Sequence, residues 1–202
     1  MADDQFIRNV PGMTEVLGRR CVAVAGCGGL GSNAAVALVR AGIGRLILVD
    51  CDRVESSNLN RQAFDQMDVG KPKVEALARH LKAIHPGVKL VTHCRRLAPG
   101  DVEPLLCDAD LLVEAFDNAH DKHWLVHEWV RCFPGRPVVS GNGVAGMGRT
   151  EELKVVRAGN IWFCGDLHSS LELGLCSARV ALVAAMQANV AIELLMNQKE
   201  TP

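Results

Sequence analysis

Short apolar segments alternate along this chain with longer segments in which apolar residues recur at helical spacing. Continuous apolar runs predict buried strands at 21–26, 45–50, 110–116 and 137–140, and the alternating segment 88–94 predicts a further strand. Amphipathic segments between them predict helices at 30–41, 72–84 and 120–132. Apolar strands that alternate with helices are typical of a mostly parallel sheet with helices on both faces. We therefore expect a doubly wound α/β fold.

The pattern changes after residue 140. Residues 141–148 are too rich in glycine for a helix or a regular strand, and residues 151–165 predict one or two short strands. Residues 178–196 predict a final helix that is apolar on most of its faces. We expect this helix to be buried, either against the sheet or in an interface between subunits.

Composition and charge limit the classes of function. The chain has 202 residues, of which 49% are hydrophobic and 22% charged, as in ordinary soluble globular proteins. Because 22 Lys and Arg face 23 Asp and Glu, no long-range field steers the protein to nucleic acid or to an anionic membrane. No run of about 18 uncharged apolar residues predicts a transmembrane helix, and the N-terminus lacks the layout of a secretion signal. These features predict a cytoplasmic protein without a membrane or nucleic-acid partner.

The eight cysteines include no Cys-x-x-Cys pair, which excludes a zinc site of paired knuckles, so no zinc is expected. In a cytoplasmic chain we expect reduced and mostly buried cysteines that pack as small apolar residues. Cys27 stands near a helix N-terminus, a position that can depress a thiol pKa. Cys164 and Cys176 follow the main strand–helix region. Packing is our interpretation for all three, and a covalent intermediate is the alternative.

One predicted helix carries three histidines. His120, His123 and His127 are spaced three and four residues apart, which places them on one helical face at a spacing compatible with a metal. A partly exposed helix face is the simpler interpretation, because no carboxylate or cysteine motif accompanies them. We expect Trp124 and Trp129 to pack this helix onto the sheet.

A glycine-rich loop ends the first predicted strand and begins the first helix, with the residues Gly26, Cys27, Gly28, Gly29, Leu30 and Gly31. Glycines permit a tight turn and let backbone N–H groups approach a phosphate, which the positive end of the helix also favours. Asp50 ends the next strand, where a carboxylate accepts hydrogen bonds from ribose hydroxyls. Together they predict an adenine-nucleotide site, but they do not distinguish NAD, FAD, SAM and ATP.

The polar residues that follow favour chemistry at a phosphate. Arg61 and Lys73 supply cations, and attack on an α-phosphate develops negative charge that cations and a metal ion stabilise. Asp117 follows the strand at 110–116, beyond the carboxyl ends of the strands, where Mg²⁺ would find an oxygen ligand. The alternative for Asp117 is a helix N-cap, and the alternative for Asp52 is a brace for its own turn.

Four segments together resemble the ThiF/MoeB/HesA family of ubiquitin-activating-enzyme-like proteins: Gly-Cys-Gly-Gly-Leu-Gly-Ser, Val-Asp-Cys-Asp-Arg-Val-Glu-Ser-Ser-Asn-Leu-Asn-Arg-Gln, Gly-Lys-Pro-Lys and Glu-Ala-Phe-Asp. The short length and the C-terminal segment Ser-Ala-Arg-Val-Ala are most similar to the compact "family 2" ThiF proteins. The resemblance implies a Rossmann-like fold and a single adenylation domain over 1–202. Its nucleotide-binding core would be 20–145, and 146–202 would serve carrier docking and dimerisation.

The resemblance also implies an activity. A ThiF-type enzyme is an ATP-dependent adenylyltransferase that converts the C-terminal glycine carboxylate of a ubiquitin-like sulfur carrier into an acyl-adenylate and releases pyrophosphate. A carrier such as ThiS, with a Gly-Gly tail, would place this chain in thiamin biosynthesis, as a homodimer that uses ATP and Mg²⁺. We expect glycines at 141–148 to let that tail approach closely, and Arg149 to meet acidic groups on the carrier.

Individual residues acquire roles from the resemblance. Asp117 would hold Mg²⁺, and Arg61, Lys73 and Asp117 would be the catalytic residues. Arg8 would reach the phosphates of the neighbouring subunit, with a solvated terminal arginine as the alternative. The expected ATP-binding residues are Gly26, Gly28, Gly29, Leu30, Gly31, Asp50, Asp52, Asn58, Arg61 and Lys73.

Other classes of function remain open. A nicotinamide- or flavin-dependent oxidoreductase explains the glycine loop and Asp50 but leaves Arg61, Lys73 and Asp117 without a purpose. A related ATP-dependent activator of another carrier, a peptide or a tRNA base would share the same motifs. A non-catalytic nucleotide-binding scaffold is the remaining alternative, and the retained cations argue against it.

Overall fold

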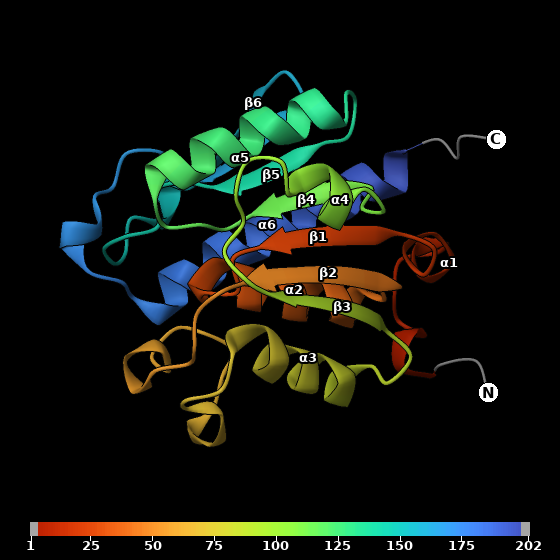
Figure 1. The fold of residues 1–202 in the computed structure, drawn as a ribbon, viewed down its shortest axis with the longest axis horizontal. Coiled ribbons are helices and arrows are strands. Elements are labelled where there is room, and N and C mark those ends of the chain that lie inside the picture. Colours follow the sequence, from red (N-terminus) through yellow and green to blue (C-terminus); the bar gives the residue numbers. More distant parts are fainter. Residues whose placement is uncertain (1–3, 199–202) are drawn as a thin grey trace.

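A seven-stranded sheet runs through the computed structural model, which describes residues 4–198 (Figure 1). The strand order is β3-β2-β1-β4-β5-β7-β6, and every pairing is parallel except that of β6 with β7. The strands are β1 (Cys21–Ala25), β2 (Arg45–Asp50), β3 (Lys89–Cys94), β4 (Leu111–Glu114), β5 (Val138–Gly141), β6 (Lys154–Ala158) and β7 (Ile161–Gly165). The Rossmann-like, mostly parallel sheet expected from the sequence is confirmed.

Helices cover both faces of the sheet, and each face has its own core. Side chains of alternate strand residues divide between the two cores: Val22 and Val24 pack on one side, Ala23 and Ala25 on the other. The first core includes α1 (Met13–Leu17), α2 (Gly29–Ala41), α3 (Lys73–Ile84) and α6 (Ser177–Asn197), and the second includes α4 (Val102–Leu106) and α5 (Ala119–Cys132). The sequence pattern missed α1 and α4, because five residues are too few to show a helical period.

The strand order reverses between β1 and β4, and this reversal opens a crevice. The chain proceeds outward from β1 to β2 and β3, and then returns to β4 on the other side of β1. The connection from β3 to α4 therefore crosses the carboxyl ends of β2 and β1 (Figure 1). In open α/β sheets this is where ligands bind.

The C-terminal segments join the same sheet. Strand β7 pairs with β5, and β6 forms the antiparallel edge. Among the described helices, α6 alone is long and apolar enough to span a membrane by length and composition, and its inner face packs on α2, β5 and β7. The other face of α6 is open, with Leu182 44% exposed. The final helix thus contributes to the core, as the sequence predicted.

The cysteines correct one expectation. Cys27 and Cys164 are fully buried, but Cys51, Cys94 and Cys107 are exposed because they stand at the ends of elements, so "mostly buried" is wrong. Burial raises the pKa of Cys164 to about 12 and that of Cys27 well above its usual value. Desolvation at Cys27 therefore outweighs the helix N-terminus. Cys176 is half-buried.

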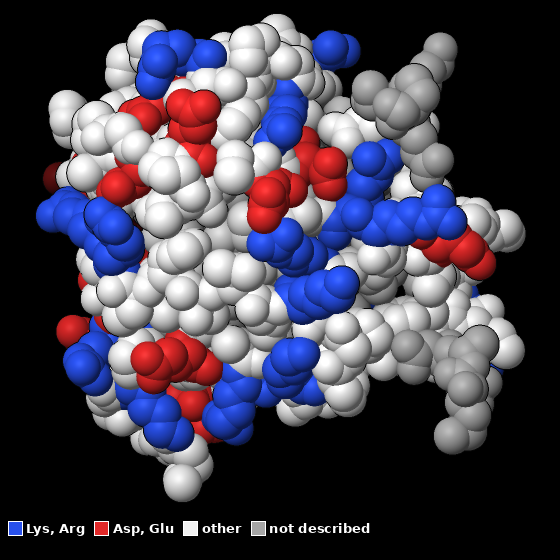
Figure 2. Space-filling model, turned by 45° about the vertical axis from the view of Figure 1, so that its right-hand side comes forward, with Lys and Arg blue, Asp and Glu red and all other residues white. Residues whose placement is uncertain are grey.

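The surface carries both signs of charge. In Figure 2 the Lys and Arg side chains lie among Asp and Glu side chains on the face shown. This distribution agrees with the net charge of −1. Any anion held by this protein must therefore be held by local geometry.

Candidate functional site

A cavity of about 1090 Å³ lies at the carboxyl ends of the parallel strands. Of the residues expected to bind ATP or metal, it is lined by Gly26, Gly28, Gly29, Leu30, Asp50, Asp52, Asn58, Arg61, Lys73 and Asp117. Gly31 and Arg8 are not part of the lining. One cavity thus joins residues from four separate sequence motifs.

Close backbone packing explains two of the loop glycines. A Cβ on Gly31 would lie 1.8 Å from the carbonyl oxygen of Gly26, and Gly26 itself has a φ of +92°. Gly31 is therefore required for the turn rather than for ligand contact. By contrast, a Cβ on Gly28 would meet only Gln62 Nε2, at 3.8 Å. This open side lies in the cavity, next to the first turn of α2, whose N–H groups have no partners within the helix.

Asp50 is fixed in place by backbone hydrogen bonds. The N–H of Cys27 donates to its Oδ2 at 2.6 Å, and the N–H of Asp52 donates to its Oδ1 at 2.8 Å. Burial raises the pKa of Asp50, while these two hydrogen bonds oppose the rise. Each carboxylate oxygen keeps a lone pair, so the group can accept hydrogen bonds from a ribose.

Lys73 begins α3 and is nearly buried, with 7% of its surface exposed. Its Nζ donates to Asp52 Oδ2 at 2.8 Å, and its backbone N–H donates to the Asp52 carbonyl at 2.9 Å. The hydrogen bond from Lys73 is the main cause of the lowered pKa of Asp52. Asp52 therefore braces the start of α3 and also faces the cavity, so both of its predicted roles are compatible with the structure.

Arg61 lies beside the glycine loop. Its Nη1 donates to the Ser57 carbonyl at 3.0 Å and to Asn60 Oδ1 at 2.7 Å. Asn33 of α2 donates through Nδ2 to the Arg61 carbonyl at 2.9 Å, which ties this segment to the helix that follows the loop. Asn58 is almost buried, and its Oδ1 accepts from the N–H of Glu55 at 3.1 Å in the short helix η2 (Ser56–Asn58).

Asp117 is exposed at the end of β4, and no described residue pairs with its carboxylate. The N-cap of α5 is Asn118, whose Oδ1 accepts from the N–H groups of His120 and Asp121 at 2.8 and 3.1 Å. The alternative prediction that Asp117 caps this helix is therefore wrong. Its carboxylate is left open to the cavity, as a metal ligand would be.

A buried polar network beside Asp117 was missed from the sequence. Glu114 is fully buried, and its Oε2 accepts from Lys122 Nζ at 2.7 Å and from Ser140 Oγ at 2.6 Å. Lys122 also donates to the Gly141 carbonyl at 2.9 Å, so it links α5 to the end of β5. A carboxylate at the end of a fully apolar strand was the available signal, because such a group is rarely buried without a partner.

The three histidines of α5 do not form a group of possible metal ligands in the described part of the chain. His120, His123 and His127 are exposed, and none belongs to a group of three possible metal ligands within residues 4–198. Trp129 is fully buried and Trp124 is half-buried on the same core, as expected. The partly exposed helix face is the interpretation that the structure supports.

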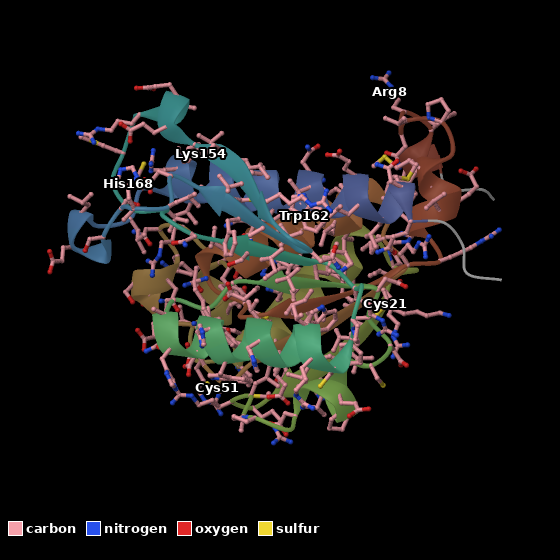
Figure 3. The ribbon with its side chains drawn as sticks, turned by 90° about the horizontal axis from the view of Figure 1, so that it is seen from above. Arg8, Cys21, Cys51, Lys154, Trp162 and His168 are labelled. Atoms are coloured by element: carbon pink, nitrogen blue, oxygen red, sulfur yellow. The ribbon has the colours of Figure 1, made fainter. Side chains whose placement is uncertain are left out.

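Arg8 lies outside the cavity. It is exposed, and Figure 3 shows it at the opposite end of the molecule from Cys51, which does line the cavity. Within one chain, Arg8 therefore cannot contact a ligand at this site. The exposed side chain of Arg149 is 3.8 Å from Glu152 at its nearest approach.

The turn that precedes Lys73 depends on a buried carboxylate. Asp68 ends the short helix η3 (Gln66–Asp68), and its side chain has no exposed surface. Arg79 Nη2 donates to Asp68 Oδ1 at 2.8 Å, and His80 Nε2 lies 2.5 Å from Asp68 Oδ2. Burial alone would raise the pKa of Asp68, but the hydrogen bonds with His80 and Arg79 lower it to about 2.

This carboxylate predicts a pH dependence of stability. The folded pKa lies below the unfolded value of about 3.9, so Asp68 stabilises the fold above pH ~4 and this contribution disappears as the pH falls toward 2. Between pH 4 and pH 2 the free energy of unfolding should fall by about 1 kcal/mol less in Asp68→Asn than in the wild-type protein, after allowance for solvent screening. Urea unfolding at a series of pH values measures this slope. The surface variant Asp108→Asn is the control. The same dependence of unfolding free energy on pH in wild type, Asp68→Asn and Asp108→Asn would contradict the prediction.

The chain is also similar to known proteins in sequence and in fold. The model of the ThiF family matches residues 6–202. The SAMP-activating enzyme E1 of Haloferax volcanii is 31% identical over 188 residues, which cover 89% of this chain and 68% of that protein. The sulfur carrier protein adenylyltransferase of Thermus thermophilus is 39% identical over 128 residues, which cover 63% of this chain and 46% of that protein.

Two further similarities define the extent of the match. The chain spans only 25% of the length of the Aspergillus niger adenylyltransferase and sulfurtransferase uba4, with 37% identity over 124 residues, or 61% of this chain. Among solved structures, the E. coli tRNA N6-threonylcarbamoyladenosine dehydratase in complex with AMP has a TM-score of 0.82 at 21% identity. That match covers 91% of this chain and 89% of that structure and shows a shared fold.

Proposed function

Because the chain belongs to the ThiF family, we propose that it is an ATP-dependent adenylyltransferase that activates the C-terminal glycine carboxylate of a ubiquitin-like sulfur carrier. The observation that carries the proposal is the single cavity in which Asp50, the glycine loop, two cations and an open carboxylate meet. An oxidoreductase would use the first two features but has no need of Arg61, Lys73 and Asp117. The relatives named as adenylyltransferases support the same choice.

The arrangement assigns a role to each group. Asp50 would hold the ribose, and the N–H groups of the first turn of α2 would hold phosphate. A carrier carboxylate is already ionised at neutral pH, so it can attack the α-phosphorus without a general base. Lys73 and Arg61 would stabilise the negative charge that develops, and pyrophosphate leaves as the acyl-adenylate forms. Catalysis then consists mainly of positioning and charge stabilisation.

Asp117 fits the role of a magnesium ligand. Its carboxylate is exposed to the cavity and unpaired among the described residues, whereas neighbouring Glu114 is already engaged by Lys122 and Ser140. Mg²⁺ retains several waters and needs only one or two protein carboxylates. Bound there, it would neutralise charge on the phosphates.

Substitution of Asp117 tests this role. We expect Asp117→Asn to raise the Mg²⁺ concentration needed for half-maximal exchange by about tenfold, because the amide is a neutral and weaker ligand than a carboxylate. Magnesium titration of pyrophosphate exchange measures the effect. Glu103→Gln, an exposed change on α4, should leave the titration unaltered. An unchanged midpoint in Asp117→Asn would remove the residue from the metal site.

The finer assignments extend this proposal. The carrier would be ThiS-like, with a Gly-Gly tail, which would place the reaction in thiamin biosynthesis in the cytoplasm. Residues 141–144 line the cavity and would admit the tail. A homodimer would allow Arg8 to act on the site of the partner subunit, since it lies far from the cavity of its own chain. Residues 146–202 would provide the surface for carrier docking and dimerisation.

The deciding experiment is ATP–pyrophosphate exchange with a set of ubiquitin-like carriers that end in Gly-Gly. Exchange should depend on one carrier, on ATP and on Mg²⁺, and it should vanish when the terminal Gly-Gly is removed. Titration with NADH is the parallel measurement. Saturable NADH binding without carrier-dependent exchange would favour the oxidoreductase and contradict the proposal. Exchange that requires a peptide or tRNA instead would move the activity to a related class of substrate.

A further inference from the structure

The connection between β3 and α4 passes over the proposed nucleotide site. It crosses the carboxyl end of β2, which carries Asp50, and then that of β1, which carries the glycine loop (Figure 1). Arg95, Arg96 and Leu97 from this connection line the cavity. No sequence motif pointed to them, because a crossing connection acquires its position only from the order of strands.

The connection is held in a defined position. Arg95 donates to both carboxylate oxygens of Asp101, at 3.0 and 3.1 Å, and the N–H of Ala98 donates to the same carboxylate. Leu97 is buried in the second core, and the N–H of Gly100 donates to Glu128 Oε1 at 2.7 Å. These contacts fix the backbone on either side of Arg96.

Arg96 extends from this connection toward α5. Its Nη2 donates to Asp121 Oδ2 at 3.0 Å, and the other oxygen of Asp121 accepts from Trp124 Nε1 at 3.2 Å. Arg96 also lies close enough to Asp52 to lower its pKa, as a smaller contribution after that of Lys73. The guanidinium is thus bound to the first turn of α5, and Arg96, Asp121 and Asp52 all line the same cavity.

Stability does not account for this placement. The side chain of Arg96 is 76% exposed, and an exposed ion pair contributes only about 0–1 kcal/mol. The pair does, however, hold a planar cation in one orientation at the cavity, and arginine stacks on flat aromatic surfaces. With phosphates at the glycine loop and the ribose at Asp50, the base must extend beyond Asp50, away from the first turn of α2. Leu97 and Phe116 belong to the second core, on the face of the sheet away from α2, and both line the cavity together with Arg96.

We propose that Arg96 is a nucleobase-binding residue whose guanidinium, oriented by Asp121, lies against the purine face of bound ATP. Leu97 and Phe116 would supply the apolar surfaces of the same subsite, and Trp124 would keep Asp121 in its rotamer. This inference rests on the proposed function, because it takes ATP as the ligand. It assigns Arg96 to binding of the base and Lys73 and Arg61 to the phosphates.

Calorimetric titration of Arg96→Ala tests the assignment. We expect about tenfold weaker binding of both ATP and AMP, the scale of a lost cation–π contact, with unchanged binding of inorganic tripolyphosphate. In pyrophosphate exchange the KM for ATP should rise while kcat stays the same. Asp121→Asn should cause a smaller loss, and Arg96→Lys should fall between wild type and alanine. Arg131→Ala, which removes another exposed arginine with an acidic neighbour but lies outside the cavity, should bind ATP normally.

The outcomes separate this inference from the proposed function. Wild-type affinity for ATP in Arg96→Ala would overturn the inference while the proposed function stands. An equal loss of tripolyphosphate binding would also overturn it, because Arg96 would then act on the phosphates or through the fold. A wild-type protein that binds neither ATP nor AMP would contradict the proposed function and this inference together.

Discussion

Replacement of Lys73 with alanine is expected to slow carrier-dependent ATP–pyrophosphate exchange by about 10²–10³-fold, the loss typical for removal of one preorganised donor at a developing charge. Lys73 is held at the first residue of α3 by Asp52, with Nζ 2.8 Å from its Oδ2, and it is shielded from solvent. It therefore needs little reorganisation when charge develops on the α-phosphate. Exchange rates at saturating ATP and carrier measure the effect.

A matched control lies two residues away. Lys71 has the same charge, but its side chain is 49% exposed and it does not line the cavity. We expect Lys71→Ala to exchange at nearly the wild-type rate. If the reaction required only local positive charge, exchange would instead be slowed in both Lys71→Ala and Lys73→Ala. An unchanged rate in Lys73→Ala, with the fold retained by circular dichroism, would exclude Lys73 from catalysis.

The strands and long helices were predictable because their signal is local. β2 begins at Arg45 and ends at Asp50 as the apolar run does, and α3 and α5 each lie within one residue of the predicted bounds. α1 and α4 were not predictable, because five residues give no period. The sheet places β7 between β5 and the antiparallel edge strand β6. That β7 pairs with β5, although β6 comes first in the chain, depends on long-range packing that no local pattern carries.

The residues of the candidate site also divide into those that a local motif predicted and those that only the tertiary structure brings to the cavity. Gly26, Asp50 and Lys73 were found because each sits in a motif whose residue types match a chemical need. Arg96 was missed because its importance comes from the strand order, which carries its connection across the crevice. For Cys27 the packing interpretation is supported, since the residue is fully buried and burial raises rather than lowers the thiol pKa. The crossing connection and the exposure of Cys51, Cys94 and Cys107 are tertiary properties, and these were the sources of error.

The glycine-rich segment after β5 depends on an ion pair that the sequence also did not reveal. Arg179, in the first turn of α6, donates through Nη2 to Asp166 Oδ2 at 2.5 Å, and both side chains are at most 4% exposed. Arg179 Nη1 donates to the carbonyls of Gly148 and Arg149. Hydrogen bonds from the N–H groups of His168 and Ser169 and from Arg179 outweigh burial, and they lower the pKa of Asp166 to about 2.

Arg179→Ala should therefore destabilise the fold by about 3–5 kcal/mol, because it leaves the buried carboxylate of Asp166 without its cation. For a chain of this size that loss corresponds to a Tm lower by about 10 °C, measurable by calorimetry. Gly143 packs closely on Asp166, because a Cβ on Gly143 would lie 2.0 Å from Asp166 Oδ1. Arg179→Ala should therefore also loosen the cavity wall at 141–144. We expect a raised KM for the carrier at temperatures where the variant is still folded.

The control for this ion pair is Arg149→Ala. The Arg149 side chain is 70% exposed, and its Nη1 lies 3.8 Å from Glu152 Oε1 in a loose ion pair. A solvated pair of this kind contributes about 0–1 kcal/mol, so its Tm should stay near that of wild type. If Arg179→Ala melted no earlier than Arg149→Ala, the buried pair would not stabilise the segment. If it melted earlier but kept the wild-type KM for the carrier, the segment would be structural and the tail would have to reach the α-phosphate by another route.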